Sequence, residues 1–187
     1  MTSDAQPLSS LPANRRGRVQ LYTGDGKGKT TAALGLAFRA AGHGWRVHIL
    51  HFMKQDSSYG EIHSAGRMGN NWQVEQCGRP NFVNRQHPAP EDIACAQQGL
   101  QRAFTLAREG QIDLLILDEL INALDFGLVS LEAVLELLAC RAPATELVLT
   151  GRNAPAPLIA AADLVTEMRC IKHYYNAGLE ARLGIEY

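Results

Sequence analysis

The chain has 187 residues, 46% hydrophobic and 20% charged, a balance typical of one globular domain rather than a disordered chain. Its 18 lysines and arginines oppose 19 aspartates and glutamates, so the formal net charge of -1 provides no overall basic field to attract nucleic acid. No stretch has the pattern of a signal peptide or the length of a membrane-spanning helix, which predicts a cytoplasmic protein with no membrane partner.

Residues 1–17 contain Pro7 and Pro12 and show little hydrophobic periodicity, which predicts a flexible N-terminal tail. Residues 18–187 are predicted to form a single domain. The four cysteines lie far apart in the sequence and form no C-x-x-C pair. They therefore predict neither a zinc site nor a disulfide framework, and we expect them to be reduced residues of ordinary packing.

An apolar strand, a glycine-rich loop and an alanine-rich helix follow one another between Arg18 and Gly42. Three glycines let the loop backbone bring its N–H groups close to a ligand, and the helix dipole is directed at the same place. Such an arrangement favours a phosphate group. The predicted nucleotide-binding residues are Gly24, Asp25, Gly26, Lys27, Gly28, Lys29, Thr30 and Thr31.

The sequence Gly28-Lys29-Thr30 matches the end of a Walker A loop. In that loop the lysine reaches the outer phosphates of a nucleoside triphosphate and the threonine hydroxyl holds magnesium. The full motif has a glycine five residues before Gly28, where this chain has Thr23, and Gly24 comes one residue late. The alternative is a glycine-rich turn without function, but the strand before it and the helix after it favour a phosphate site.

A second strand is predicted from Arg46 to Met53, with His48 and His51 as part of its packing. From Lys54 to Pro90 only the stretch 72–77 has the pattern of a strand. Long connections in compact domains are usually functional or disordered, and this one leaves the edge where parallel sheets bind ligands. We therefore expect it to cover a substrate.

A helix is predicted from Pro90 to Glu109, because proline and two acids open it and a glycine follows it. The next stretch, residues 113–119, is an apolar strand that ends in Asp118 and Glu119. This is the Walker B pattern, in which a carboxylate supports the magnesium ion, and either acid could be that residue. The alternative is that the two acids only begin a helix.

The last third of the chain continues the alternation of helices and strands. Helices are predicted at 131–138 and 155–162, and strands at 146–150 and 164–168. Arg152 follows the first of these strands, where a guanidinium could brace phosphate charge, although it could also be an ordinary surface arginine. The predicted fold is an α/β, P-loop NTPase-like, doubly wound, mostly parallel six-stranded sheet.

These residues predict an ATP site with magnesium but do not choose the reaction. Kinases and ATPases act on the terminal phosphoryl group, whereas an alkyl transferase would use the ribose 5′ carbon and release the whole phosphate chain. Walker-type residues stabilise either leaving group.

From about Arg18 to Tyr187 the chain closely resembles the ATP:corrinoid adenosyltransferases of the cobalamin pathway, the family named for cob(I)yrinic acid a,c-diamide adenosyltransferase. The late glycine of the phosphate loop is also a mark of that family. The segments that carry the resemblance are GDGKGKTT (24–31), AGHG (41–44), LDEL (117–120), TGR (150–152), ADLVTEM (162–168), Lys172-His173 and GIEY (184–187).

The resemblance implies transfer of the 5′-deoxyadenosyl group of ATP to cobalt(I) of a reduced corrinoid, with release of tripolyphosphate. It also implies a homodimer, an electron-donating reductase partner, and Mg²⁺ or Mn²⁺ as the metal. By matching positions, Lys29, Glu119 and Arg152 would be the catalytic residues, and Thr30 with Asp118 or Glu119 would hold the metal.

Family members often have a Gly-Phe-Thr-Trp-like segment beside the corrinoid, whereas this chain has GRPNFV at 78–83, which keeps only Phe82 as an aromatic. We expect Lys54, Tyr59, Glu61 and Phe82 on the corrinoid side. The stretch EIHSAG (61–66) is superficially similar to a cobalt-binding histidine signature, but a loop histidine is the better interpretation of His63. The alternatives to the transferase are a P-loop small-molecule kinase or ATPase, and a non-catalytic protein that binds ATP and a corrinoid.

Overall fold

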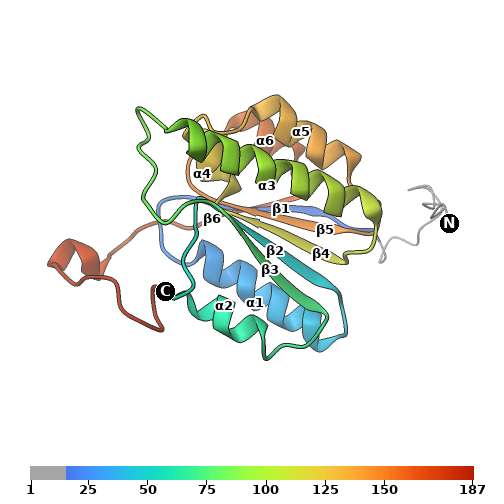
Figure 1. Ribbon diagram of the computed structural model, residues 1–187, viewed down its shortest axis with the longest axis horizontal. Coiled ribbons are helices and arrows are strands. Elements are labelled where there is room, and N and C mark those ends of the chain that lie inside the picture. The colour runs from blue at the N-terminus through green and yellow to red at the C-terminus, as the bar shows by residue number, and fades with distance from the viewer. Residues whose placement is uncertain (1–15) are drawn as a thin grey trace.

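Six strands form one sheet at the centre of the computed structural model, which describes residues 16–187 (Figure 1). Their order is β3-β2-β4-β5-β1-β6, and every neighbouring pair is parallel. The predicted α/β class and the six strands are confirmed, and the sheet is wholly rather than mostly parallel. The strands are β1 (Val19–Thr23), β2 (Val47–Phe52), β3 (Trp72–Cys77), β4 (Leu114–Asp118), β5 (Glu146–Thr150) and β6 (Leu164–Glu167).

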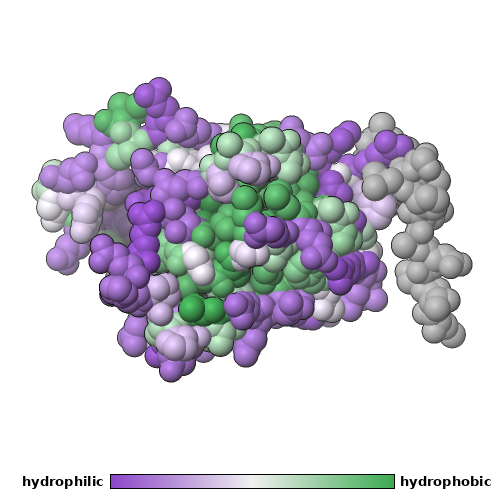
Figure 2. All heavy atoms as spheres, turned by 90° about the horizontal axis from the view of Figure 1, so that it is seen from above, coloured by the Kyte–Doolittle hydropathy of each residue, from purple (hydrophilic) through white to green (hydrophobic). Residues whose placement is uncertain are grey.

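Helices cover both faces of this sheet. Figure 1 shows α1 and α2 on one face and α3, α4, α5 and α6 on the other. Seen from the side that α3, α5 and α6 cover, the surface has an apolar central area with polar margins (Figure 2). The helices are α1 (Lys29–Gly42), α2 (Gly60–Ala65), α3 (Pro90–Glu109), α4 (Leu120–Asp125), α5 (Leu131–Cys140) and α6 (Ala156–Ala161), followed by the 3₁₀ helix η3 (Tyr174–Ala177).

The sheet separates two hydrophobic clusters, one under each helical layer. Strands β2 and β4 are buried along their whole length, which explains their nearly continuous apolar sequences. On the α1 face, Ala33, Ala37 and Ala40 pack against the sheet, so the helix that follows the phosphate loop lies close to the strands. The loop therefore leads directly into a helix that is closely packed on the sheet.

Helix α2 is not predicted by the sequence, and α4 corresponds to the helix start at Asp118-Glu119 that was only the alternative to a metal site. Each has six residues, too few to show a helical repeat of apolar positions, and neither has the proline that marks the start of the equally short α6. Helix α2 has no buried residue and lies in the segment expected to cover a substrate. All four cysteines are free, but Cys170 is exposed, so the expectation that all of them are packing residues is wrong for this one.

The predicted N-terminal tail lies outside the described residues except for residues 16 and 17. The Gly17 N–H donates to the Pro143 carbonyl (2.9 Å), and the Gly17 carbonyl accepts from Arg141 Nη2 (3.0 Å). Within the described part of the chain, no helix combines the length and apolar character that crossing a bilayer requires.

The strand order sets the position of the predicted site residues. The predicted phosphate loop (residues 24–31) follows β1, Asp118 ends β4 and is followed by Glu119, and β5 lies between these two strands. Because all strands run in the same direction, their carboxyl ends meet at one edge of the sheet. Segments that are far apart in the sequence are thereby brought together.

Candidate active site

A cavity of 1080 Å³ lies at the carboxyl edge of the sheet. The phosphate loop, the β4–α4 junction, helix α2 and the C-terminal residues 184–187 all contribute to its wall. Most residues that the sequence predicts for the site line this one cavity. They are Asp25, Gly26, Lys27, Gly28, Lys29, Thr30, Thr31, Lys54, Tyr59, Glu61, Glu119 and Arg152.

The conformation of the predicted phosphate loop (residues 24–31) depends on its glycines and on contacts with the residues after β6. Gly24 and Gly28 have φ values of 94° and 117°, which side-chain-bearing residues rarely adopt. The Gly26 N–H donates to the Met168 carbonyl at 2.7 Å, and a Cβ on Gly26 would lie only 2.7 Å from that oxygen. This close approach explains why the loop requires glycine at position 26.

The Lys29 side chain is buried and bridges the phosphate loop. Its ammonium donates to the carbonyls of Gly24 (2.7 Å) and Gly26 (2.8 Å). Burial and the nearby Arg152 guanidinium lower the pKa of Lys29 from its ordinary value. An anionic ligand at the loop would oppose both effects and would stabilise the charged ammonium.

Lys27 has a different partner. Its ammonium donates to the Ile185 carbonyl at 3.1 Å and lies 3.6 Å from a carboxylate oxygen of Glu186. Glu186 also accepts a hydrogen bond from the Tyr174 hydroxyl. Lys27 therefore connects the phosphate loop to the C-terminal residues that form part of the cavity wall.

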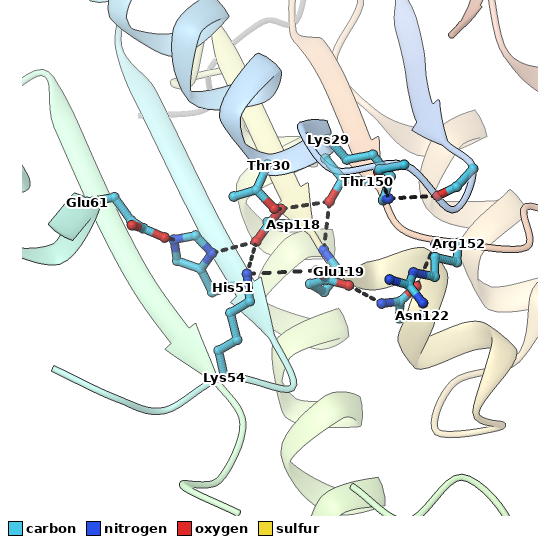
Figure 3. A network of polar contacts seen from close by, with 12 residues as sticks. Lys29, Thr30, His51, Lys54, Glu61, Asp118, Glu119, Asn122, Thr150 and Arg152 are labelled. Atoms are coloured by element: carbon cyan, nitrogen blue, oxygen red, sulfur yellow. Dashed lines mark hydrogen bonds and ion pairs between the residues drawn. The ribbon is translucent and has the colours of Figure 1, made fainter. Parts of the chain in front are cut away.

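Asp118 is the centre of the polar network at the base of the cavity (Figure 3). Its Oδ1 accepts from the hydroxyls of Thr30 (2.8 Å) and Thr150 (2.7 Å), and its Oδ2 accepts from Lys54 Nζ (2.8 Å) and lies 2.8 Å from His51 Nδ1. Burial alone would raise the pKa of Asp118, but Lys54 and His51 lower it below its ordinary value. The carboxylate is thus ionised, and its hydrogen-bonding capacity is filled.

Glu119 faces the cavity from the next position in the chain. It has a φ of 63°, in the left-handed region that non-glycine residues occupy mainly where structure or function requires it. Its N–H donates to the Thr150 hydroxyl (2.9 Å), and its carboxylate accepts from the Asn122 amide. Burial and the charge of Asp118 raise the pKa of Glu119. A bound cation would counter both effects.

Arg152 reaches the cavity from the loop after β5. Its backbone N–H donates to Asn122 Oδ1 at 2.6 Å, which fixes the loop against α4 (Figure 3). The preceding Gly151 has a φ of 143°, and a Cβ there would lie 2.7 Å from the Asn122 nitrogen. The exposed Arg152 side chain is therefore carried by a firmly held backbone.

Sequence reasoning did not identify His51, Thr150 and Asn122 as site residues. His51 was expected to belong to strand packing, and it is buried, but its ring lies against Asp118 because β2 and β4 are neighbours in the sheet. The signal for Thr150 was its position at the carboxyl end of a strand. Asn122 had no signal, since the short helix that carries it was not predicted.

Two residues that the sequence analysis considered, Phe82 and His63, are not among the residues that line the cavity. Phe82 is fully exposed and is not among the residues that line the cavity. His63 is exposed on α2 rather than in a loop. The structure thus groups Lys54, Tyr59 and Glu61 at the cavity but does not bring Phe82 to them.

The donor set at the cavity fits a hard divalent cation that is bound together with a phosphate ligand. Thr30 donates its hydroxyl proton to Asp118, so the lone pairs of its oxygen stay available, and Glu119 offers a carboxylate nearby. Within residues 16–187 there is no cluster of three or more histidines, cysteines or acids that could hold a metal ion. Magnesium often takes one or two protein oxygens and completes its shell with water and substrate phosphates.

Comparison with known proteins agrees with this geometry. The family model for "ATP:corrinoid adenosyltransferase BtuR/CobO/CobP" matches residues 15–187. The corrinoid adenosyltransferase of Escherichia coli K12 is 34% identical over 93% of this chain and 87% of its own length. The corresponding proteins of Pseudomonas aeruginosa and Salmonella typhimurium are 35% and 34% identical over 93% and 92% of this chain, and over 85% and 86% of their own lengths. The chain therefore belongs to the ATP:corrinoid adenosyltransferase family.

Proposed function

We propose that this protein transfers the 5′-deoxyadenosyl group of ATP to the cobalt(I) centre of a reduced corrinoid and releases tripolyphosphate. The main observation in support is that the phosphate loop and Glu119 face a single cavity of 1080 Å³. Ligand pockets usually measure about 300–1,000 Å³, so this cavity has room for a nucleotide and part of a second substrate.

In this reaction the cobalt(I) electron pair forms a bond to the ribose 5′ carbon, and the bond from that carbon to the triphosphate oxygen breaks. The electron pair of the broken bond leaves with tripolyphosphate, and the cobalt becomes formally cobalt(III). Cobalt(I) is a strong nucleophile, so no protein base is needed. The protein contributes position and charge stabilisation.

The phosphate loop would hold the triphosphate through its backbone N–H groups, with Thr31 at the start of α1. Lys29 already has its ammonium within the loop, where it would neutralise phosphate charge. Arg152 also lines this cavity and would contact the same phosphate charge. These contacts stabilise the leaving group as its charge increases.

For the metal we propose Thr30 and Glu119 as the protein ligands. Magnesium, when bound, would supply further positive charge to the leaving phosphates. Asp118 has all its acceptor positions occupied, and its role would be to orient the Thr30 hydroxyl. This assignment chooses Glu119 from the two acids that the sequence left open. Manganese would fit the same oxygen ligands.

Lys54, Tyr59 and Glu61 line the cavity on the α2 side and would face the corrinoid. Phe82 would join them only if the segment 78–89 moved, since it is now fully exposed. The homodimer and the reductase partner remain predictions that rest on the family resemblance, and the cytoplasmic location remains a prediction that rests on the sequence pattern.

The decisive experiment combines ATP, magnesium and a chemically reduced corrinoid with the full-length protein, followed by identification of the products. Tripolyphosphate and a light-sensitive alkylcorrinoid would support the proposal. ADP as the product would support a kinase or ATPase, and binding of both substrates without turnover would support a non-catalytic carrier.

A further inference from the structure

Residues 169–187 leave the phosphate loop after β6 and return to it. At their start, the Met168 carbonyl accepts from the Gly26 N–H at 2.7 Å. At their end, the Ile185 carbonyl accepts from Lys27 Nζ at 3.1 Å. Between these points the segment projects away from the sheet, as the red end of the chain in Figure 1 shows. This C-terminal strap (residues 169–187) is therefore closed on two neighbouring residues of the phosphate loop.

The returning end of the C-terminal strap is organised around Glu186. Its carboxylate accepts hydrogen bonds from the Tyr174 hydroxyl and from the Arg182 N–H (2.8 Å). The Arg182 guanidinium lies 3.4 Å from the same carboxylate and 4.8 Å from the centroid of the Tyr174 ring. These contacts hold Glu186 at 3.6 Å from Lys27 Nζ. The strap therefore offers the ammonium a carbonyl and a carboxylate in fixed positions.

Lys27 is the polar link between this end of the strap and the rest of the domain. Within the described part of the chain, the hydrogen bonds and ion pairs that join residues 170–187 to residues 16–168 are those of Lys27. Apolar packing does not replace this link along the strap, because Ile171 and Leu183 are 85% and 74% exposed. The position of the strap therefore depends on one side chain of the phosphate loop.

Lys27 has donor capacity beyond the strap. An ammonium has three N–H donors, and Ile185 accepts from one of them. The Glu186 oxygen at 3.6 Å is too distant to accept a hydrogen bond from another. Lys27 can therefore donate to a phosphate oxygen without releasing the Ile185 carbonyl.

We propose that Lys27 couples phosphate binding at the loop to closure of the C-terminal strap, so that a bound triphosphate fixes the strap against the cavity. The inference rests on the proposed function for the phosphate site and adds to it a wall that responds to the ligand. Strap residues His173 and Tyr187 line the cavity, so fixing the strap completes the wall around the substrates.

The opposite response would be displacement of the strap, because phosphate and the Glu186 carboxylate repel each other. The contacts of Glu186 oppose this outcome. Arg182 balances its charge and Tyr174 donates to it, so the carboxylate presents little uncompensated charge to the ligand. Closure and displacement predict changes of opposite sign in the mobility of the strap.

The test is hydrogen–deuterium exchange of the full-length protein with and without inorganic tripolyphosphate, read by mass spectrometry. Amides of residues 170–187 should exchange about tenfold more slowly with the ligand, the effect of one additional hydrogen bond to a charged group. The Gly184 N–H, which donates to the Tyr187 carbonyl within the strap, is one such amide. Unchanged or faster exchange in the strap would overturn the proposal.

Lys27→Met identifies the side chain responsible, because methionine keeps the length and apolar character of the stem but has no donor. Each protein is measured at a tripolyphosphate concentration that calorimetry shows to be saturating, and peptides covering residues 24–31 report that the loop is occupied. The ligand should then leave strap exchange unchanged in Lys27→Met. The matched control is Glu180→Gln, at an exposed position of the strap, which should show the wild-type slowing. Equal slowing in Lys27→Met and wild type would refute the role of Lys27.

The experiment separates this inference from the proposed function. If the wild-type protein forms alkylcorrinoid but tripolyphosphate does not slow exchange in the strap, only the inference fails. If it forms no alkylcorrinoid but the strap responds to tripolyphosphate through Lys27, the proposed reaction fails and the coupling stands.

Discussion

Replacement of Asp118 by asparagine should strongly destabilise the fold, because it removes the charge that four donors share. Asparagine has nearly the same size but only one acceptor oxygen, so its amide must face either the two hydroxyls or Lys54 and His51. Lys54 would lose its closest carboxylate, and its side chain is only 17% exposed. Removal of one partner from a buried ion pair costs about 3–5 kcal/mol, and we expect about 3 kcal/mol here because Glu119 remains 3.9 Å from Lys54.

The assay is urea denaturation of wild type and Asp118→Asn at a series of pH values. The folded-state pKa of Asp118 lies below its ordinary value of 3.8. The stability from the ionised carboxylate is therefore complete above that value and is lost as the pH falls toward the folded-state pKa. The difference between the two proteins should be constant from about pH 5 to 8 and should decrease at more acidic pH.

The matched control is Glu136→Gln, which removes an ion pair with Arg108 in which both side chains are more than half exposed. Its cost should be no more than about 1 kcal/mol. A loss below about 1 kcal/mol in Asp118→Asn, or a loss that stays the same at acidic pH, would refute the assignment of Asp118 as the ionised centre of the network.

Three further predictions, two of them with a comparison variant, concern the phosphate loop and the metal site. Lys29→Ala should weaken ATP binding by about 100-fold in calorimetry, since charge-assisted hydrogen bonds contribute about 1.5–3 kcal/mol each. Lys27→Ala should lose less ATP affinity, because Lys27 is held by the C-terminal residues. Equal losses of affinity in the two variants would contradict this prediction. Gly26→Ala should lower Tm, because the added Cβ would collide with backbone atoms. Gly35→Ala, where the added Cβ has no neighbouring atom within 4 Å, should instead stabilise helix α1 by about 1 kcal/mol. A Gly26→Ala protein as stable as wild type would show that the loop does not pack against residues 168 and 169 as described. Glu119→Gln should increase the magnesium concentration needed for half-maximal activity, and an unchanged metal titration would transfer the metal role to Asp118.

The sequence alone predicts those parts of this protein whose conformation is set by residues close to one another in the chain. Glycine spacing, a preceding apolar run and a following helix predict the phosphate loop, and the apolar run before Asp118 predicts strand β4. The bounds of α3 agree at both ends because proline, acids and glycine mark them locally. Helices α2 and α4 are hard to predict because six residues show too little periodicity and, unlike the equally short α6, neither has a proline at its start.

Only the tertiary structure shows that Asp118 is buried within a polar network whereas Glu119 lines the cavity. His51 is 67 residues from Asp118 in the sequence, and Thr30 is 88 residues away, yet both contact its carboxylate. These contacts exist because β2 and β4 are neighbours and because the carboxyl ends of all strands meet at one edge. Strand order follows from how the helical connections cross the sheet, a long-range property that no short stretch of sequence specifies. The chemistry of the loop is therefore local, whereas the choice of Glu119 as the acid that faces the cavity depends on the assembled sheet.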